Sequence, residues 1–224
     1  MKPAQRFAQV LALPDAAVPL DEAALLVAAC AKPGLDVAHG LARLDDLAAG
    51  VRVPTLDGLV DHLFRRLGFT GDSDNYYDPR NSFLDDVIER RLGLPIALSV
   101  LTMEVGRRIG VPLWGVGMPG HFLLRDKVDP RVFIDPFHGG QQLDERGCRR
   151  LYLAMRGPGA AWDSSFLNPV ERRSIVARML ANLKSFYEQA GDEDALAWVL
   201  RLRLAIPGST DDGLALARLL ARWN

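Results

Sequence analysis

Apolar residues recur at spacings of three and four through the first third of the chain, which is the pattern of amphipathic helices packed on a core. Four segments carry this pattern, at residues 3–12, 21–31, 36–49 and 55–67. A polar, turn-rich stretch, GFTGDSDNYYDPRNS, follows them. We therefore predict an N-terminal helical region over residues 1–70. The breaks between the four segments coincide with prolines, which end or begin helices, at Pro14, Pro19, Pro33 and Pro54.

Two further helices are predicted after the polar stretch. Asn81 or Ser82 is suited to cap the first one, because Asp85 stands three residues after Ser82 in a capping-box arrangement. Pro95 suits the first turn of the second helix, where its missing N–H costs nothing, and the helical pattern continues to residue 110. The next segment, VPLWGVGM, has the composition of a strand.

Residues 120–135, GHFLLRDKVDPRVFID, alternate apolar and polar positions in two short runs around a turn. Alternation with a period of two is typical of a half-buried antiparallel hairpin. If Arg125 faces Arg131, counting outward sets His121 directly opposite Asp135. Cβ atoms of direct cross-strand partners lie roughly 4.5 to 5.5 Å apart, so we expect an imidazole–carboxylate hydrogen bond. The apolar face of this hairpin is then formed by Phe122, Leu124, Val132 and Ile134.

The order of these elements predicts an α+β fold, in which helices pack on a small antiparallel sheet over residues 71–162. The chain returns to a helical pattern after Trp162. Within it, NLKSFYEQAGDEDALAWVLRLRLAIP has apolar and turn residues at nearly the positions of a tetratricopeptide unit, and a last helix follows at 212–223. We predict a tetratricopeptide-like tail over 163–224 that leans on the preceding domain, with an ordinary helical hairpin as the alternative.

Composition narrows the class of protein. The chain has 224 residues, 49% of them apolar, and a formal net charge of −1, so it has material for a core and no charge excess that favours nucleic acid or an acidic membrane. No apolar stretch approaches the ~18 residues of a membrane span or the continuous apolar part of a signal peptide. Cys30 and Cys148 have no metal or redox spacing. We expect a soluble, cytoplasmic protein without a cofactor.

Three patterns with possible chemistry are set aside. GVGMPG, at 115–120, matches a dinucleotide-binding fingerprint, but Pro119 and the strand pattern that follows deny it the required helix. His39 and His62 lie within amphipathic helices, where a structural role is expected. His121, Asp135 and His138 have the residue types of a two-histidine, one-carboxylate metal face, but no spacing signature supports one, so we expect no bound metal.

Several blocks of sequence resemble one family. NYYDPRNSFLDDVIERRLGLPIALSVLTMEVGRRIGVPLWGVGMPGHFLLR, followed by IDPFHGG, is similar to the bacterial SirB-type proteins of the transglutaminase-like superfamily, and NLKSFYEQAGDEDAL resembles their repeat-like end. The resemblance implies a papain-like core with a Cys at the start of a helix and a His and an Asp on adjacent strands. His121 and Asp135 match the His and the Asp. Pro95 stands where the resemblance implies the nucleophilic Cys, which departs from the catalytic pattern.

Other residues are candidates for the cleft that this resemblance implies. Ser99 lies one turn beyond Pro95 and is the candidate substitute nucleophile, although a small residue in helix packing explains it as well. Tyr76 and Tyr77 are candidates for the rim of the cleft, with plain packing as the alternative. Arg80 and Asn81, with Arg91 nearby, are candidate polar contacts for a peptide or an acidic group, with ion pairing and capping as the alternatives. No sequence pattern brings Cys148 to the hairpin, so it would lie there only through tertiary packing that the sequence does not predict.

Three functions follow from the pairing of His121 with Asp135. The preferred one is a non-catalytic, regulatory module that binds a protein or peptide, because the nucleophile is absent. The second is a hydrolase or acyl-transfer enzyme in which His121 is the general base, Asp135 orients it, and water or Ser99 attacks. The third keeps the pair as a structural hydrogen bond that locks the hairpin.

Overall fold

The computed structural model describes residues 1–207 and 212–221. In chain order the elements are α1 (Pro3–Leu11), η1 (Asp15–Ala17), α2 (Leu20–Ala31), α3 (Val37–Ala49), α4 (Leu56–Val60), η2 (Asp61–Arg66), β1 (Thr70–Gly71), η3 (Pro79–Asn81), α5 (Leu84–Arg90), β2 (Leu92–Gly93), α6 (Pro95–Arg108), β3 (Leu113–Val116), β4 (Leu123–Asp126), β5 (Phe133–Asp135), β6 (Gln141–Leu143), α7 (Glu145–Arg156), η4 (Ser164–Leu167), α8 (Arg172–Ala190), α9 (Glu193–Leu204) and α10 (Asp212–Leu220).

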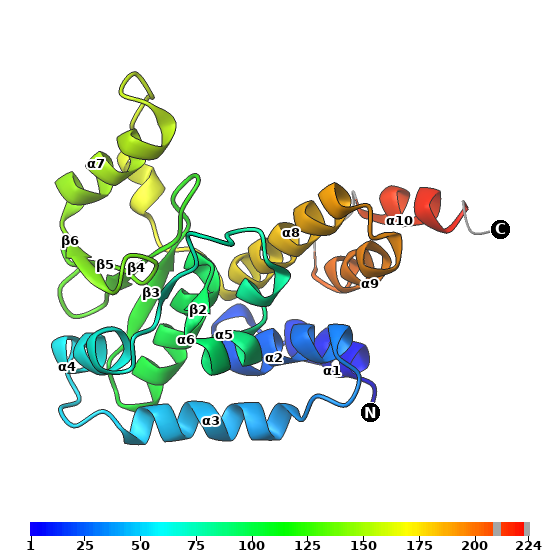
Figure 1. The fold of residues 1–224 in the computed structure, drawn as a ribbon, viewed down its shortest axis with the longest axis horizontal. Helices are drawn as coiled ribbons and strands as arrows, with labels where there is room; N and C mark the ends of the chain where they lie inside the picture. Colours follow the sequence, from blue (N-terminus) through cyan, green and yellow to red (C-terminus); the bar gives the residue numbers. More distant parts are fainter. Residues whose placement is uncertain (208–211, 222–224) are drawn as a thin grey trace.

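A four-stranded antiparallel meander in the order β3-β4-β5-β6 lies beside α6 (Figure 1). The strands β1 and β2 form a separate parallel pair. Phe122, Leu124 and Ile134 share one apolar core with α6. On the opposite face of the sheet, Leu123 and Phe133 belong to a second core that also contains residues of α7. The predicted α+β order, helices packed on a small antiparallel sheet, is therefore confirmed.

Two details of the predicted hairpin are wrong. In the structure Leu124 pairs with Ile134 and Arg125 with Phe133, so the register is shifted by two residues from the predicted pairing of Arg125 with Arg131. The hairpin is also buried on both faces rather than on one, because α7 and the segment after it cover the side that carries Leu123 and Phe133. Apolar runs of this kind are expected for strands that are covered on both faces.

The predicted cap of the helix after the polar stretch is also wrong. The chain between residues 79 and 81 forms the short 3₁₀ turn η3, which is capped by the carboxylate of Asp78. Ser82 ends that turn, and α5 begins two residues later with Phe83 in the cap position and no side-chain cap. The second helix begins at Pro95 as predicted, because proline is tolerated in the first helical turn.

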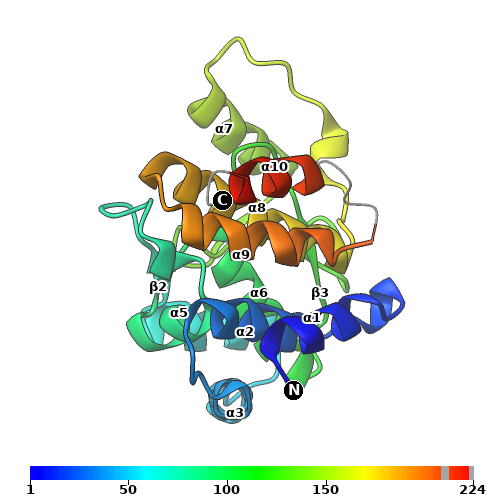
Figure 2. The ribbon, with the colours of Figure 1, turned by 90° about the vertical axis from the view of Figure 1, so that its right-hand side faces the viewer.

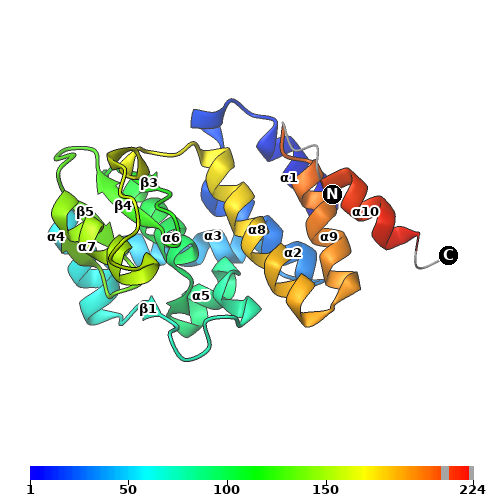
Figure 3. The same ribbon diagram turned by 90° about the horizontal axis from the view of Figure 1, so that it is seen from above.

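The four helical segments predicted for the first third are confirmed as α1, α2, α3 and the continuous stretch of α4 and η2. α2 lies between α1 and α5, with α3 along the outer side (Figures 1 and 3). Nine residues of α2 are buried, and one of them is Asp21. A helix that is apolar on nearly all sides is expected to be buried in this way. The N-terminal helices and α6 belong to one continuous core.

The C-terminal helices form a stack beside the N-terminal ones (Figures 2 and 3). The predicted helical hairpin is present as α8 and α9, with the left-handed Gly191 ending α8 and the carboxylate of Asp192 capping α9. α10 packs on α9 and begins at the predicted residue, whereas the predicted end at 223 lies outside the described residues. Within the described ranges, no helix is both long enough and apolar enough to cross a membrane.

Candidate functional site

His121 and Asp135 form a buried hydrogen-bonded pair. Nε2 of His121 lies 2.9 Å from Oδ1 of Asp135, and the side chains are 4% and 1% exposed. Because Nε2 faces the carboxylate, Nδ1 is the imidazole nitrogen left for another partner, and it has none among the described residues. The predicted proximity of this pair is therefore confirmed, although the two residues are not direct cross-strand partners.

Asp135 accepts hydrogen bonds from four donors. Besides His121, these are the backbone N–H groups of Phe137 and His138 and Nδ1 of His138, the last at 2.7 Å from Oδ2. Burial alone would raise the pKa of the Asp135 carboxyl, but hydrogen bonds and positive charge from His121 and then His138 outweigh burial and hold the pKa below its ordinary value. The carboxylate is therefore charged and fully engaged at neutral pH.

Tight turns place these side chains. Asp135 is the last residue of β5, and His121 stands just before β4, where Gly120 adopts the left-handed φ of 85°. After Asp135 the chain turns back over β1, and the N–H of Gly71 donates to the carbonyl of Phe137 at 2.8 Å. A Cβ at Gly71 would lie 2.3 Å from the Phe137 ring, so only glycine permits this approach. The ring of Phe137 in turn packs edge-on against His121.

Pro95 lies in the same pocket as His121. This hollow, called here the histidine pocket, has a volume of about 220 Å³ and lies between the start of α6, the turn before β4 and α8. Among the described residues that line it, none is a Cys, Ser or Thr. Its lining residues are Tyr76, Pro95, Ile96, Gly120, His121, Phe122, Arg178 and Asn182.

The candidate substitute nucleophiles lie outside the histidine pocket. Ser99 is fully buried in α6, and its Oγ has no hydrogen-bond partner among the described residues. Cys148 is buried in the second core, and burial, together with the charge of Asp135, raises the pKa of its thiol to about 12. Burial also raises the pKa of the Cys30 thiol to about 11. Thiols with such pKa values stay protonated near neutral pH and are poor nucleophiles.

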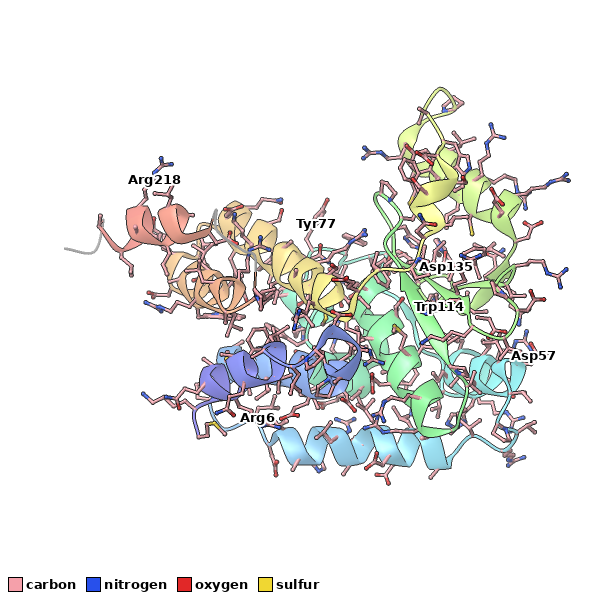
Figure 4. All side chains as sticks on the ribbon, turned by 180° about the vertical axis from the view of Figure 1, so that it is seen from behind. Arg6, Asp57, Tyr77, Trp114, Asp135 and Arg218 are labelled. Carbon is pink, nitrogen blue, oxygen red and sulfur yellow. The ribbon has the colours of Figure 1, made fainter. Side chains whose placement is uncertain are left out.

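The predicted rim residues separate into two hollows. Tyr76 lines both the histidine pocket and a neighbouring hollow of about 90 Å³, whereas Tyr77 lines only the smaller hollow. Tyr77 is 69% exposed. In Figure 4 it lies beside α8, whereas Asp135 lies at the sheet. The structure therefore brings Tyr76, but not Tyr77, next to His121.

The residues predicted as polar contacts, Arg80, Asn81 and Arg91, line neither of these two hollows. Arg80 folds back on Asp78, with Nη2 2.6 Å from the carboxylate. Asn81 is fully buried, donates to the carbonyl of Asn75 and accepts from Arg90. Arg91 donates to the carbonyl of Leu67. Each of these side chains has a partner within the fold.

Two polar residues of the histidine pocket were not predicted. Arg178 and Asn182 stand four residues apart on α8, so they share one face of that helix. This polar pair within SIVARMLANLK was visible in the sequence, but nothing local shows that α8 packs across the start of α6.

The cluster of His121, Asp135 and His138 forms as the sequence suggested. One ligand atom from each residue lies within 4.8 Å of the others. In the structure the two imidazoles use their nitrogens to contact the Asp135 carboxylate, and His138, with its side chain 48% exposed, faces a separate polar hollow of about 720 Å³.

Comparison with known proteins agrees with this architecture. A sequence profile described as the transglutaminase-like superfamily matches residues 35–181. The chain is 40% identical over 201 residues to a UPF0162 protein of Xylella fastidiosa (strain Temecula1), covering 82% of this chain and 70% of that one. It is 34% identical over 181 residues to a UPF0162 protein of Pseudomonas aeruginosa, covering 77% and 66%. Human F-box only protein 21 is 32% identical over 146 residues, covering 61% and 22%. No solved structure matches the chain.

The match to the profile covers more than half of the chain and spans the His121–Asp135 pair. The chain therefore belongs to the transglutaminase-like superfamily. Within that superfamily its similarity over most of its length places it with the UPF0162 proteins.

Proposed function

We propose that this protein is a non-catalytic transglutaminase-like module that binds a peptide or protein segment in the histidine pocket. The observation that carries the proposal is the side chain opposite His121. Pro95 occupies the first position of α6 and lines the same pocket as His121, and the family resemblance implies a nucleophile at that position. A proline ring has no group to deprotonate, so the base and its orienting carboxylate have no nucleophile of the protein to activate.

The fixed geometry of the pair supports a binding role. Asp135 is held by four donors and His121 by Asp135, so the pocket wall is rigid without a ligand. Preformed walls of this kind lower the entropic cost of binding. The matched region makes up only 22% of human F-box only protein 21, so the same type of domain also occurs as one part of a larger protein.

The proposed regulatory role and the proposed tetratricopeptide-like tail rest on the sequence resemblance. The similarity to SirB-type proteins favours a regulatory role in the cytoplasm, and the α8–α9 hairpin supports a tetratricopeptide-like tail that forms one wall of the binding site. A single such hairpin cannot bury its apolar face alone, which agrees with its packing on α1 and α2.

The competing function is hydrolysis with His121 as the general base and a water molecule as the nucleophile. It is favoured by one observation, the unpartnered Nδ1 of His121 at the histidine pocket. A general base contributes typically about 10² to 10⁴-fold, so this function also requires oxyanion stabilisation.

Turnover assays separate the two functions. Peptide, ester and amide substrates are incubated with the wild-type protein and with His121→Ala, and each product is quantified over long incubations at high protein concentration. The binding function predicts equal background rates for both proteins. Turnover that disappears in His121→Ala, with a folded variant shown by its circular dichroism spectrum, contradicts it and supports hydrolysis.

A further inference from the structure

Arg178 is a half-buried cation that has no acidic partner among the described residues. Its Nη2 donates to the carbonyl oxygens of Met118 at 3.1 Å and His121 at 2.8 Å, and its guanidinium lies over the ring of Phe122 at 5.5 Å. A guanidinium carries five N–H donors, so Nε and Nη1 have three donors without an acceptor in the described part of the chain.

The electrostatics of Arg178 differ from those of the paired arginines. Carboxylates raise the pKa of Arg6, Arg80 and Arg131. Burial, by contrast, lowers the pKa of Arg178 below its ordinary value, since no carboxylate offsets the loss of solvent. An anion that binds beside a cation of this kind lowers the free energy, because it supplies the counter-charge that the protein does not provide.

The histidine pocket around Arg178 has no acidic lining residue among those described. Asn182, which also lines it, has no hydrogen-bond partner for its side chain in the described ranges. At the edge, the exposed Arg156 of α7 passes within 3.9 Å of the position that a Cβ would take on Gly120. The positive charge of Arg178 and the free donors of Arg178 and Asn182 therefore lie at one small space, whereas only the Cδ methylene of Arg156 is placed at its edge.

An apolar hollow adjoins this pocket. The hollow of about 90 Å³ shares Tyr76 and Asn182 with the histidine pocket. Its other lining residues are mainly apolar or aromatic, such as Leu94 and Phe186, with Asp78, Ser82 and Ser185 as the polar ones, and Asp78 is already paired with Arg80. A single ligand can thus place a charged group beside Arg178 and an apolar group beside Leu94. Together the two hollows measure about 310 Å³, which lies at the lower end of the roughly 300 to 1,000 Å³ of ligand pockets and is room enough for the end of a peptide.

We propose that the histidine pocket recognises a carboxylate of a peptide, with Arg178 as the anchoring cation, and that an apolar side chain of the same peptide fills the neighbouring hollow. This inference rests on the proposed binding function and names the chemistry of its ligand. The planar fork of an arginine matches the two oxygens of a carboxylate, and one half-buried cation balances one negative charge. A dianionic phosphate would remain only partly compensated by it.

The test follows the Nε–H resonance of Arg178 in ¹⁵N-labelled protein, assigned by its disappearance in Arg178→Gln. The probes are N-acetyl-Ala-Ala-Leu with a free C-terminus, the same peptide as its C-terminal amide, N-acetyl-Glu-Leu-amide, and inorganic phosphate. We expect the Arg178 resonance to shift with a carboxylate peptide, and that peptide to bind at least about tenfold more tightly than the uncharged amide. Response to the free C-terminus alone, or to the glutamate peptide alone, identifies the source of the carboxylate.

Matched variants locate the effect. Arg178→Gln should weaken carboxylate binding by about tenfold or more, whereas Arg201→Gln, which removes an exposed arginine of α9, should change it by less than about twofold. If Arg178→Gln does not fold, Arg178→Lys, which also removes this resonance, supplies the assignment, and the titration of the wild-type protein decides. Equal binding of the amide peptide at this resonance, tighter binding of phosphate, or no shift with any peptide overturns the inference. Equal binding of the amide peptide would contradict carboxylate recognition but leave the proposed peptide-binding function intact. Failure of this inference can therefore be distinguished from failure of the proposed function.

Discussion

At the scale of single residues, Asp135 determines the geometry of the site. It accepts from the imidazoles of His121 and His138 and from two backbone N–H groups, so it orients His121 and closes the turn after β5 at the same time. The proximity of His121 and Asp135 was predictable from the period-two alternation even though the register was not. A slip of two residues keeps every side chain on its face of the sheet, so the pair remained within reach.

The lowered pKa of Asp135 makes its contribution depend on pH. A carboxyl whose pKa is lower in the folded than in the unfolded protein adds stability above the ordinary pKa of about 3.9, and that stability is lost as pH falls through the folded value. We expect Asp135→Asn to be less stable than the wild type by about 1 to 3 kcal/mol at pH 7, because the amide cannot accept from all four donors. Urea unfolding at pH 7 and at steps below pH 4 measures the difference. A gap that stays constant or widens at low pH contradicts this assignment.

Ser99 gives a second prediction at this scale. Its buried Oγ has no partner in the described part of the chain, whereas Oγ1 of the equally buried Thr102 donates to the carbonyl of Leu98 at 2.8 Å. Removing an unsatisfied buried hydroxyl relieves a desolvation cost. Ser99→Ala should therefore leave the free energy of unfolding unchanged or raise it by up to about 1 kcal/mol, with Thr102→Val as the matched control that loses stability. Destabilisation by Ser99→Ala of more than that of Thr102→Val would show an unseen partner.

At the scale of elements, α6 joins the site to the core. Its first residue, Pro95, lines the histidine pocket, and near its end the fully buried Glu104 contacts Arg107, Arg108 and Arg172. Because Arg172 begins α8, this cluster connects the helix that carries Pro95 with the helix that carries Arg178. Burial, followed by the nearby charge of Asp21, raises the pKa of Glu104, while the arginines oppose that shift.

Replacing Glu104 tests this connection. Glu104→Gln removes the carboxylate that three arginines contact in a buried position. Because burial and Asp21 already disfavour its charge and the Arg107 side chain is 52% exposed, we expect a loss of about 1.5 kcal/mol, the lower end for hydrogen bonds to charged groups, and not that of a fully broken buried ion pair. The control is Asp45→Asn, which pairs with the same Arg108 from a side chain that is 68% exposed and should cost less than about 1 kcal/mol. Denaturant unfolding of both variants supplies the comparison. Equal losses would mean that the cluster does not hold α6 and α8 together.

The elements themselves were largely predictable, and their ends less so. Helical spacing and prolines located α1, α2, α3 and α6. The expected cap at Asn81 or Ser82 is wrong because the carboxylate of Asp78 caps the earlier turn η3, which contains Asn81 and ends at Ser82. Competition between nearby capping residues depends on backbone geometry, which a spacing rule does not contain.

At the scale of the whole molecule, the pocket exists because α8 returns from the end of the chain to lie against α6 and the turn before β4 (Figure 3). The side chains that complete it, Arg178 and Asn182, are more than fifty residues beyond His121 in the sequence. Such long-range packing leaves no local signal, so the sequence identified the His–Asp pair and the absent nucleophile but not the opposite wall. The division at residues 70 and 162 stays a prediction, and one core spans the N-terminal helices, α6 and α8.

The central claim is that Pro95 stands where a nucleophile would face His121, and the thiol introduced by Pro95→Cys tests it most directly. The pKa of this thiol is measured from the pH dependence of its alkylation by iodoacetamide, in the variant and in the double variant Pro95→Cys, His121→Ala. Cys30 and Cys148, with pKa values of about 11 and about 12, contribute little background. We predict a pKa of roughly 7 or below, lowered by the helix N-terminus and the imidazole, that rises in the double variant. A pKa near about 8.5 that is unaffected by His121→Ala would contradict the account.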